Sequence, residues 1–156
     1  MKKRIIALGL LWCLFAVMLQ AARVDTVLVR SAAMNKDVKV VYVLPDKAIG
    51  KQACPVVYLL HGYGGNARSW VQLKPELPQM ADEKGIIFVC PDGKNSWYWD
   101  SPENPAYRYE TFVTSELVKY TDGNYATIPD RKARAISGLS MGGHGALWSA
   151  IRHKDV

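Results

Sequence analysis

The most constraining feature of this sequence is a run of small residues and glycines near its end. Residues 133–137 (Ala-Arg-Ala-Ile-Ser) alternate like a short strand, and from Met141 onward apolar residues recur at helical spacing. Between the two segments, residues 138–142 read Gly-Leu-Ser-Met-Gly and fit G-x-S-x-G, a pattern that places a serine on a strained strand-to-helix turn. The glycines let the two backbones pass closely. The pattern predicts that Ser140 is a nucleophile held out of a sheet.

Three fixed positions match by chance roughly once in twenty chains of this length, since glycine makes up about 7% of residues and serine is similar. The alternative interpretation is a glycine-rich turn that carries an ordinary serine. The segments that precede the turn decide between the two.

Composition limits the size and the partners of the protein. The chain has 156 residues, of which 49% are hydrophobic, and this suffices for one buried core. The formal charge is +6, from 20 basic and 14 acidic residues. Three basic residues lie in an N-terminal segment that we expect to be removed, which leaves 17 basic residues and a charge of +3. This excess is too small to indicate a nucleic-acid partner.

Residues 1–22 have the pattern of a secretory signal peptide. Basic residues 2–4 precede an apolar run over residues 5–19, and the small Ala21 and Ala22 follow. The run is shorter than the ~20 apolar residues of a membrane-spanning helix, which favours a cleaved signal over an uncleaved anchor. Cys13 suggests lipidation, but the bulky Trp12 before it argues against this. We therefore expect an exported protein, periplasmic or extracellular, with no stable membrane insertion after the signal is removed.

Four segments have the pattern of further strands. Residues 24–29 and 38–43 are rich in valine and roughly alternating, and they predict a hairpin around a turn at residues 33–37. Residues 55–60 and 86–90 are continuous apolar runs, which suit strands that are covered on both faces. Residues 47–53 are polar and predict a loop.

Helical patterns separate these strands. Residues 75–84 are compatible with a helix that Gly85 stops, and a clearer helix has apolar residues at three- and four-residue steps, namely Tyr109, Phe112, Val113, Leu117 and Tyr120. Apolar strands that alternate with helices predict an α/β fold with a mainly parallel sheet. In such a sheet, loops gather at the carboxyl ends of the strands. Here these loops are residues 61–65, residues 91–93 and the turn at Ser140.

Residues 61–65 (His-Gly-Tyr-Gly-Gly) predict a loop that stabilises negative charge. Acyl transfer places negative charge on a carbonyl oxygen, and preorganised backbone N–H groups stabilise it. One donor is the residue after the nucleophile, here Met141, and the other comes from a loop after an earlier strand. Tyr63 is the candidate for the second donor. The alternative is that the glycines only make this loop flexible.

Four blocks, in order, resemble the putative-esterase family of α/β-hydrolases, which includes S-formylglutathione hydrolases, feruloyl and acetylxylan esterases, and mycolyltransferases of the antigen 85 type. The blocks are residues 58–65, 91–98, 109–112 and 138–143. The resemblance runs from about residue 24 to residue 156. It implies a three-layer α/β-hydrolase fold with Ser140 as the nucleophile and the Tyr63 and Met141 amides as the oxyanion hole. It implies no metal and no organic cofactor.

The catalytic triad of this fold runs in the order serine, acid, histidine. Chain order therefore argues against the candidates that precede Ser140, namely His61, Asp92 and Asp100. We interpret His144 as a surface or packing residue of the helix, and we do not expect His153 or Asp155 in the triad. Residues 23–156 are thus expected to be the N-terminal portion of a hydrolase domain, truncated after the serine turn. This portion alone should be inactive and poorly stable.

An aromatic run, Trp97, Tyr98 and Trp99, follows a loop at a strand end. Aromatic side chains suit flat ligands, so the run is a candidate wall of an acyl or sugar pocket. The alternative is that it packs a long loop against the body of the protein. Trp70 is interpreted as a packing residue, and Glu110 as a structural charge near the start of a helix.

The sequence therefore predicts a secreted serine carboxylic-ester hydrolase that acts on acyl groups attached to carbohydrate, through an acyl-enzyme that water hydrolyses. The first alternative is a thioesterase similar to S-formylglutathione hydrolase, which the export signal disfavours because that role is cytosolic in the family. The second is an inactive fragment or binding module of the same fold.

The remaining cysteines are not expected to form a disulfide, although export would permit one. Cys54 precedes its strand and Cys90 ends the next. In parallel neighbouring strands the two residues lie roughly 15 Å apart, beyond the ~7 Å limit between bridged Cα atoms.

Overall fold

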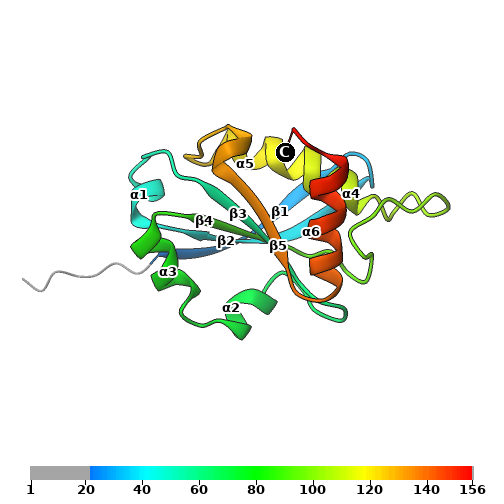
Figure 1. The fold of residues 1–156 in the computed structure, drawn as a ribbon, viewed down its shortest axis with the longest axis horizontal. Coiled ribbons are helices and arrows are strands. Elements are labelled where there is room, and N and C mark those ends of the chain that lie inside the picture. The colour runs from blue at the N-terminus through cyan, green and yellow to red at the C-terminus, as the bar shows by residue number, and fades with distance from the viewer. Residues whose placement is uncertain (1–21, 156) are drawn as a thin grey trace, which may run out of the picture.

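The computed structural model describes residues 22–155, which build a mixed five-stranded sheet with helices on both faces (Figure 1). The strands are β1 (Arg23–Ser31), β2 (Lys36–Leu44), β3 (Val56–Leu60), β4 (Ile87–Pro91) and β5 (Arg134–Gly138). Their spatial order is β1-β2-β4-β3-β5. Strand β3 is parallel to both β4 and β5, whereas β2 is antiparallel to β1 and β4. The predicted hairpin and parallel core are confirmed, and the predicted signal segment lies outside the described residues except for Ala22.

Alternate residues of the central strands face two separate cores, because successive side chains of a strand point to opposite faces of the sheet. Tyr42, Tyr58 and Val89 belong to one core, and their neighbours Val43, Leu59 and Phe88 belong to the other. All six side chains are buried. The continuous apolar runs of the sequence follow from this cover on both faces.

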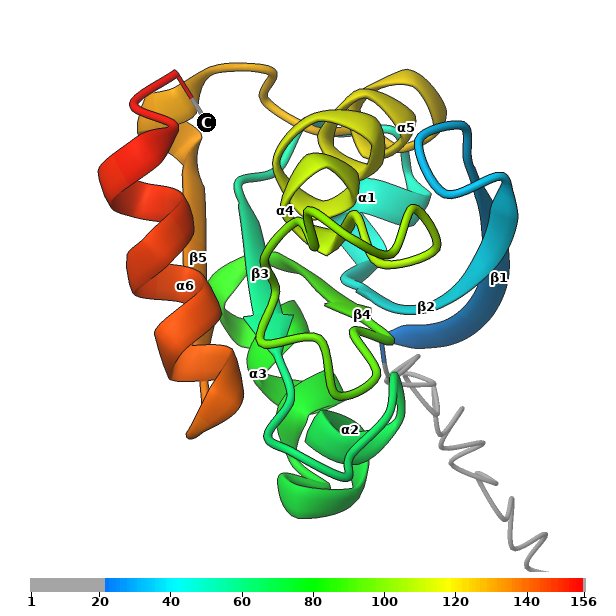
Figure 2. The same cartoon turned by 90° about the vertical axis from the view of Figure 1, so that its right-hand side faces the viewer.

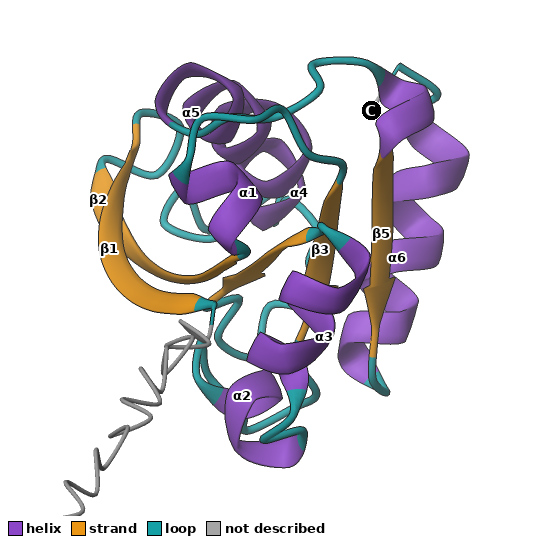
Figure 3. Ribbon diagram, turned by 90° about the vertical axis from the view of Figure 1, so that its left-hand side faces the viewer, coloured by secondary structure: helices purple, strands orange, loops and turns teal. Residues whose placement is uncertain are grey.

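Helices form the outer layers. One core is covered by α4 (Tyr109–Thr111), the π-helical turn η1 (Phe112–Glu116), α5 (Leu117–Asn124) and α6 (Met141–Arg152). The other core is covered by α2 (Ser69–Leu73) and α3 (Leu77–Lys84). Figures 2 and 3 show the sheet between these two groups of helices. The predicted three-layer arrangement is therefore confirmed. No helix in the described part of the chain is both long enough and apolar enough to cross a membrane.

Three local features refine the sequence prediction. Residues expected in a loop form the short helix α1 (Asp46–Ile49), because the Pro45 carbonyl accepts hydrogen bonds from two following amides at 2.9 and 3.1 Å. Gly85 ends α3 in the left-handed conformation, as expected of a stop signal (φ 63°). The helix that begins at Tyr109 contains a π-helical turn, where the Thr114 hydroxyl donates to the Glu110 carbonyl at 2.7 Å.

The carboxyl ends of β3, β4 and β5 lie at one edge of the sheet, as their parallel register requires. Leu60, the last residue of β3, pairs with Gly138, the last residue of β5. The Leu139 amide donates to the Leu60 carbonyl at 3.2 Å. The loops after β3 and β4 and the turn after β5 are therefore neighbours, which confirms the predicted convergence.

Cys54 and Cys90 are buried free thiols, so the prediction of no disulfide is confirmed. Cys54 precedes the start of β3 and Cys90 lies near the end of β4, and the two strands run parallel. Burial raises the pKa of the Cys90 thiol to about 12. Cys54 packs in one core and Cys90 in the other. Cys13 lies outside the described residues.

Candidate active site

Ser140 occupies a strained backbone conformation between β5 and α6. Its φ of 53° and ψ of −114° fall in a region that residues with a side chain rarely adopt. The residue is exposed, and it directly precedes the first turn of α6. Such a turn presents the hydroxyl to solvent at the end of the parallel strands.

The two glycines that flank Ser140 are required by close backbone contacts. A Cβ atom on Gly138 would lie 2.3 Å from the backbone of Gly142. A Cβ atom on Gly142 would lie 2.2 Å from the Leu60 carbonyl oxygen. Any side chain at either position would push α6 away from β3 and β5, so the position of Ser140 depends on both glycines.

Two backbone N–H groups beside Ser140 are available as donors. Within residues 22–155, neither Tyr63 nor Met141 donates its amide to a backbone carbonyl. Met141 is the first residue of α6, where amides lack a partner inside the helix. The Tyr63 loop lies against the turn, because a Cβ on Gly62 would be only 3.7 Å from the Ser140 Cβ. Unpaired, fixed N–H groups of this kind can stabilise an oxyanion.

His61 fixes this loop from the inside. Its ring is buried, and Nε2 accepts a hydrogen bond from the Gly93 amide at 2.9 Å. Nδ1 therefore carries the proton and donates to the Gly62 carbonyl at 2.7 Å. Because both ring nitrogens are used, His61 is not placed to act as a base for Ser140.

Asp92 is engaged in the same part of the structure. Its carboxylate accepts hydrogen bonds from the Lys94 amide at 3.0 Å and from Lys94 Nζ at 2.9 Å, and it lies 3.7 Å from His61 Nε2. Burial alone would raise the pKa of Asp92, but the two hydrogen bonds and the positive charge of Lys94 outweigh burial and hold this pKa well below its usual range. Asp92 is a carboxylate that fixes the turn after β4.

The other two histidines are also bonded elsewhere. His144 Nδ1 lies 3.0 Å from the Trp97 carbonyl oxygen, to which it donates. His153 follows α6, about 20 Å from Ser140 at 1.5 Å per residue, and its Nε2 bonds to Glu110 at 2.8 Å. The chain contains three histidines, and in the described residues each has a hydrogen-bond partner other than Ser140.

Glu110 does more than place a negative charge at the start of a helix. Its carboxylate accepts hydrogen bonds from Trp148 Nε1 and Arg152 Nε at 2.7 Å each, and from His153. Burial would raise the pKa of Glu110, but these three donors outweigh burial and lower it. Glu110 therefore connects α4 to the C-terminal half of α6. Asp100 is structural in a similar way, because its carboxylate accepts from the amide and the hydroxyl of Thr111.

The aromatic run after β4 divides into one buried and two exposed residues. Tyr98 is fully buried, its hydroxyl accepts a hydrogen bond from the His61 amide at 2.9 Å, and its ring fills the space beside Gly93 and Gly145. Tyr98 therefore does not line a pocket, contrary to the expectation for the whole run. Trp97 and Trp99 are exposed by 46% and 45%.

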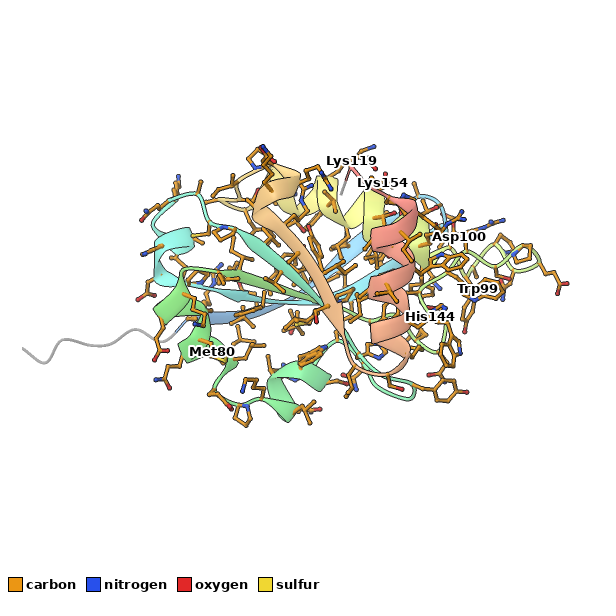
Figure 4. All side chains as sticks on the ribbon, in the orientation of Figure 1. Met80, Trp99, Asp100, Lys119, His144 and Lys154 are labelled. Atoms are coloured by element: carbon orange, nitrogen blue, oxygen red, sulfur yellow. The ribbon has the colours of Figure 1, made fainter. Side chains whose placement is uncertain are left out.

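Trp97 and Trp99 line an open pocket of about 320 Å³ together with two residues of α6, His144 and Trp148. Figure 4 shows the labelled Trp99 and His144 on the same side of the molecule, Trp99 on the loop and His144 on the helix. The sequence prediction did not include His144 or Trp148 in the pocket. Their spacing, four and eight residues after Ser140, could have indicated that they follow Ser140 along one face of the helix.

Two further observations complete the site. Trp70 Nε1 donates to the Leu60 carbonyl at 3.0 Å and its ring packs against the second core, so the packing interpretation is confirmed. No group of three or more His, Cys, Asp or Glu side chains in residues 22–155 is arranged to hold a metal ion.

Comparison with known proteins agrees with this geometry. The model of a family described as putative esterase matches residues 31–156. An acetyl esterase of Caldicellulosiruptor saccharolyticus is 28% identical over 131 residues, which cover 79% of this chain and 48% of that protein. An S-formylglutathione hydrolase of Bos taurus is 31% identical over 134 residues, which cover 72% of this chain and 46% of that protein.

A solved structure of a ferulic acid esterase has a TM-score of 0.74 and 31% sequence identity, over 86% of this chain and 57% of that one. These matches confirm the resemblance inferred from the sequence and the fold that it implies. The chain spans about half the length of the curated relatives it matches, 48% and 46%.

Proposed function

Because the chain belongs to the putative esterase family, we propose that the protein is an exported serine carboxylesterase that removes acyl groups from carbohydrate. One observation carries the proposal. Ser140 lies on a positive-φ turn whose flanking glycines admit no side chain, and it adjoins Met141 and the Tyr63 loop, whose amides have no backbone acceptor within residues 22–155. This combination supplies a nucleophile and the donors for an oxyanion.

In the proposed reaction, Ser140 Oγ attacks the ester carbonyl carbon and loses its proton to a base. The carbonyl oxygen becomes an oxyanion that accepts hydrogen bonds from the Tyr63 and Met141 amides. Collapse of this intermediate expels the alcohol, which takes up the proton, and leaves an acyl-enzyme that water hydrolyses. In this proposal the acid and the histidine of the triad follow Ser140 in the full-length protein, in the order typical of the fold.

The substrate and the location have separate support. Acetyl and ferulic acid esterases are among the similar proteins, and exposed tryptophans beside the serine helix suit a flat ligand such as a sugar ring. The signal-like residues 1–22 favour export. The thioesterase alternative has support from the S-formylglutathione hydrolase match, but the export signal disfavours it.

The nucleophile is tested with a fluorophosphonate probe on the full-length protein. We expect labelling of the wild type, no labelling of Ser140→Ala, and more than a thousandfold loss of esterase activity in that variant. Ser137→Ala, on the strand just before the turn, is the matched control and should label normally. Ser140→Ala turnover above a tenth of the wild-type value would show that the nucleophile assignment is wrong.

The substrate class and export need their own measurements. Rates on acetylated xylan, methyl ferulate and S-formylglutathione should rank a carbohydrate ester first, and a clear preference for S-formylglutathione would establish the alternative. N-terminal sequencing of the protein from an exporting host should begin at residue 22 or 23. Retention of Met1 would contradict cleavage of a signal.

A further inference from the structure

The pocket formed by Trp97, Trp99, His144 and Trp148, here called the tryptophan pocket, has two exposed indole rings on a loop and two residues on α6. The His144 ring is perpendicular to Trp97 at 5.5 Å between centroids and stacks on Trp148 at 6.0 Å. Exposed tryptophans that surround an open pocket cost hydration free energy unless a ligand covers them.

The loop side of this pocket is held in a fixed conformation. Trp97 and Tyr98 both have a positive φ, 56° and 57°, which persists only where the surrounding structure enforces it. The buried Tyr98 supplies that enforcement, because its hydroxyl bonds to the His61 amide and its ring packs beside Gly145. The flanking tryptophans are therefore presented outward by a rigid anchor.

The helix side is fixed as well. Trp148 Nε1 donates to Glu110, and the Arg152 guanidinium lies 4.9 Å from the Trp148 ring centroid. A ligand that enters a pocket with preordered walls loses little free energy to side-chain ordering. The pocket is thus suited to binding rather than to simple surface packing.

The pocket offers a hydrogen-bond acceptor for a hydroxyl group of a ligand. A carbonyl oxygen only accepts, so the 3.0 Å contact between His144 Nδ1 and the Trp97 carbonyl places the proton on Nδ1. In the neutral ring, His144 Nε2 is then a hydrogen-bond acceptor, and the residue is exposed. Indole faces combined with one acceptor match a ring that carries hydroxyl groups.

The pocket is also at a useful distance from the nucleophile. His144 and Trp148 follow Ser140 by four and eight residues, which is about 6 and 12 Å along the helix axis. A ring in the pocket would therefore lie within about two helical turns of an ester carbonyl at Ser140. The pocket is open, as a polymer chain that continues past the site requires.

We propose that the tryptophan pocket binds the sugar ring whose hydroxyl carries the ester, so that it is the leaving-group subsite of the enzyme. This rests on the proposed function. An aromatic acyl group, such as a feruloyl group, is the competing occupant, and the test separates the two.

The first measurement is binding without catalysis. Unesterified xylotriose and ferulic acid are titrated into the full-length Ser140→Ala protein while tryptophan fluorescence is recorded. We expect xylotriose to bind and Trp99→Ala, made in the same background, to weaken binding about tenfold. Trp99→Phe should restore part of the affinity. Lys119→Ala, at an exposed polar position of α5 outside the pocket, is the control and should bind normally.

The second measurement uses the active full-length protein. The ratio of kcat/KM for an acetylated xylo-oligosaccharide to kcat/KM for nitrophenyl acetate should fall about tenfold in Trp99→Ala and stay constant in Lys119→Ala. A selective loss on methyl ferulate would overturn the proposal in favour of an acyl pocket, and an unchanged ratio would overturn it outright. Absence of Ser140-dependent hydrolysis of any ester in the wild type would instead contradict the proposed function, whatever the titrations show.

Discussion

Two buried tyrosines allow a matched test of how the loop at residues 61–65 is held. Tyr98 and Tyr58 are exposed by 0% and 1%. The Tyr98 hydroxyl accepts a hydrogen bond from the His61 amide at 2.9 Å. The Tyr58 hydroxyl is buried and has no hydrogen-bond partner in the described part of the chain. Substitution by phenylalanine removes the hydroxyl and keeps the ring, so the two variants differ mainly in the hydrogen bond that is lost.

The expected effects differ in size and in sign. Tyr98→Phe leaves the buried His61 amide without an acceptor, which lowers the free energy of unfolding by about 1–3 kcal/mol. Tyr58→Phe removes a polar group that is already unpaired, so the free energy of unfolding should stay constant or rise by up to ~1 kcal/mol. Tyr98→Phe should also reduce kcat severalfold, because the amide that it releases belongs to the residue that fixes the Tyr63 loop.

Urea unfolding of the full-length protein at pH 7 measures both effects, with equal m-values as the check that the unfolding transition has not changed. The reasoning requires Tyr98→Phe to be the less stable variant by at least ~1 kcal/mol. Equal stabilities, or a larger loss in Tyr58→Phe, would refute the role given to the Tyr98 hydroxyl.

Two further predictions concern stability. Gly142→Ala should prevent folding or reduce stability severely, because its Cβ would lie 2.2 Å from the Leu60 oxygen. Gly143→Ala, whose Cβ would lie 3.4 Å from its nearest neighbour, should be neutral or stabilise α6 by ~0.5–1 kcal/mol. Thermal unfolding of both variants checks this. Glu110→Gln should lower the free energy of unfolding at pH 7 by about 1–3 kcal/mol. Because folding lowers the pKa of Glu110, its stabilisation is complete above the unfolded value of ~4.3 and is lost as the pH falls through the folded value. The difference between variant and wild type should therefore shrink in unfolding measured from pH 7 down to pH 2, and a constant difference would contradict the role of the carboxylate.

The serine turn and the parallel core could be predicted because local chemistry specifies them. Gly138 and Gly142 lie where two backbones are in contact and leave no space for a side chain, and the sequence shows this requirement as the G-x-S-x-G pattern. Strands covered on both faces have to be apolar at every position, which makes β3 and β4 recognisable as continuous runs. Both patterns can be read from neighbouring positions in the sequence, although the contacts that require them involve distant residues.

The arrangement of the aromatic run could not be predicted in the same way. Trp97, Tyr98 and Trp99 are adjacent aromatic residues. Which of them is buried depends on space beside Gly93, on the turn just before them, and beside Gly145, far away in the sequence. The partners of Glu110 come from the end of α6, about 40 residues later, and no local pattern reports them. This part of the site is determined by side-chain contacts between segments that are distant in the sequence.

His144 allows a test of whether the catalytic base lies within residues 23–156. It lies four residues after Ser140 and is exposed, whereas His61 is buried and His153 follows the far end of α6. To act as the base, however, its Nε2 would have to accept a hydrogen bond from Ser140 Oγ, whereas the hydrogen bond from Nδ1 to the Trp97 carbonyl and the stacking on Trp148 hold the ring in the tryptophan pocket. We therefore expect residues 23–156, expressed alone, to turn over nitrophenyl esters at least a thousandfold more slowly than the full-length protein. Comparable rates, abolished by His144→Ala, would show that the base lies within these residues and that the His144 ring turns towards Ser140 during catalysis.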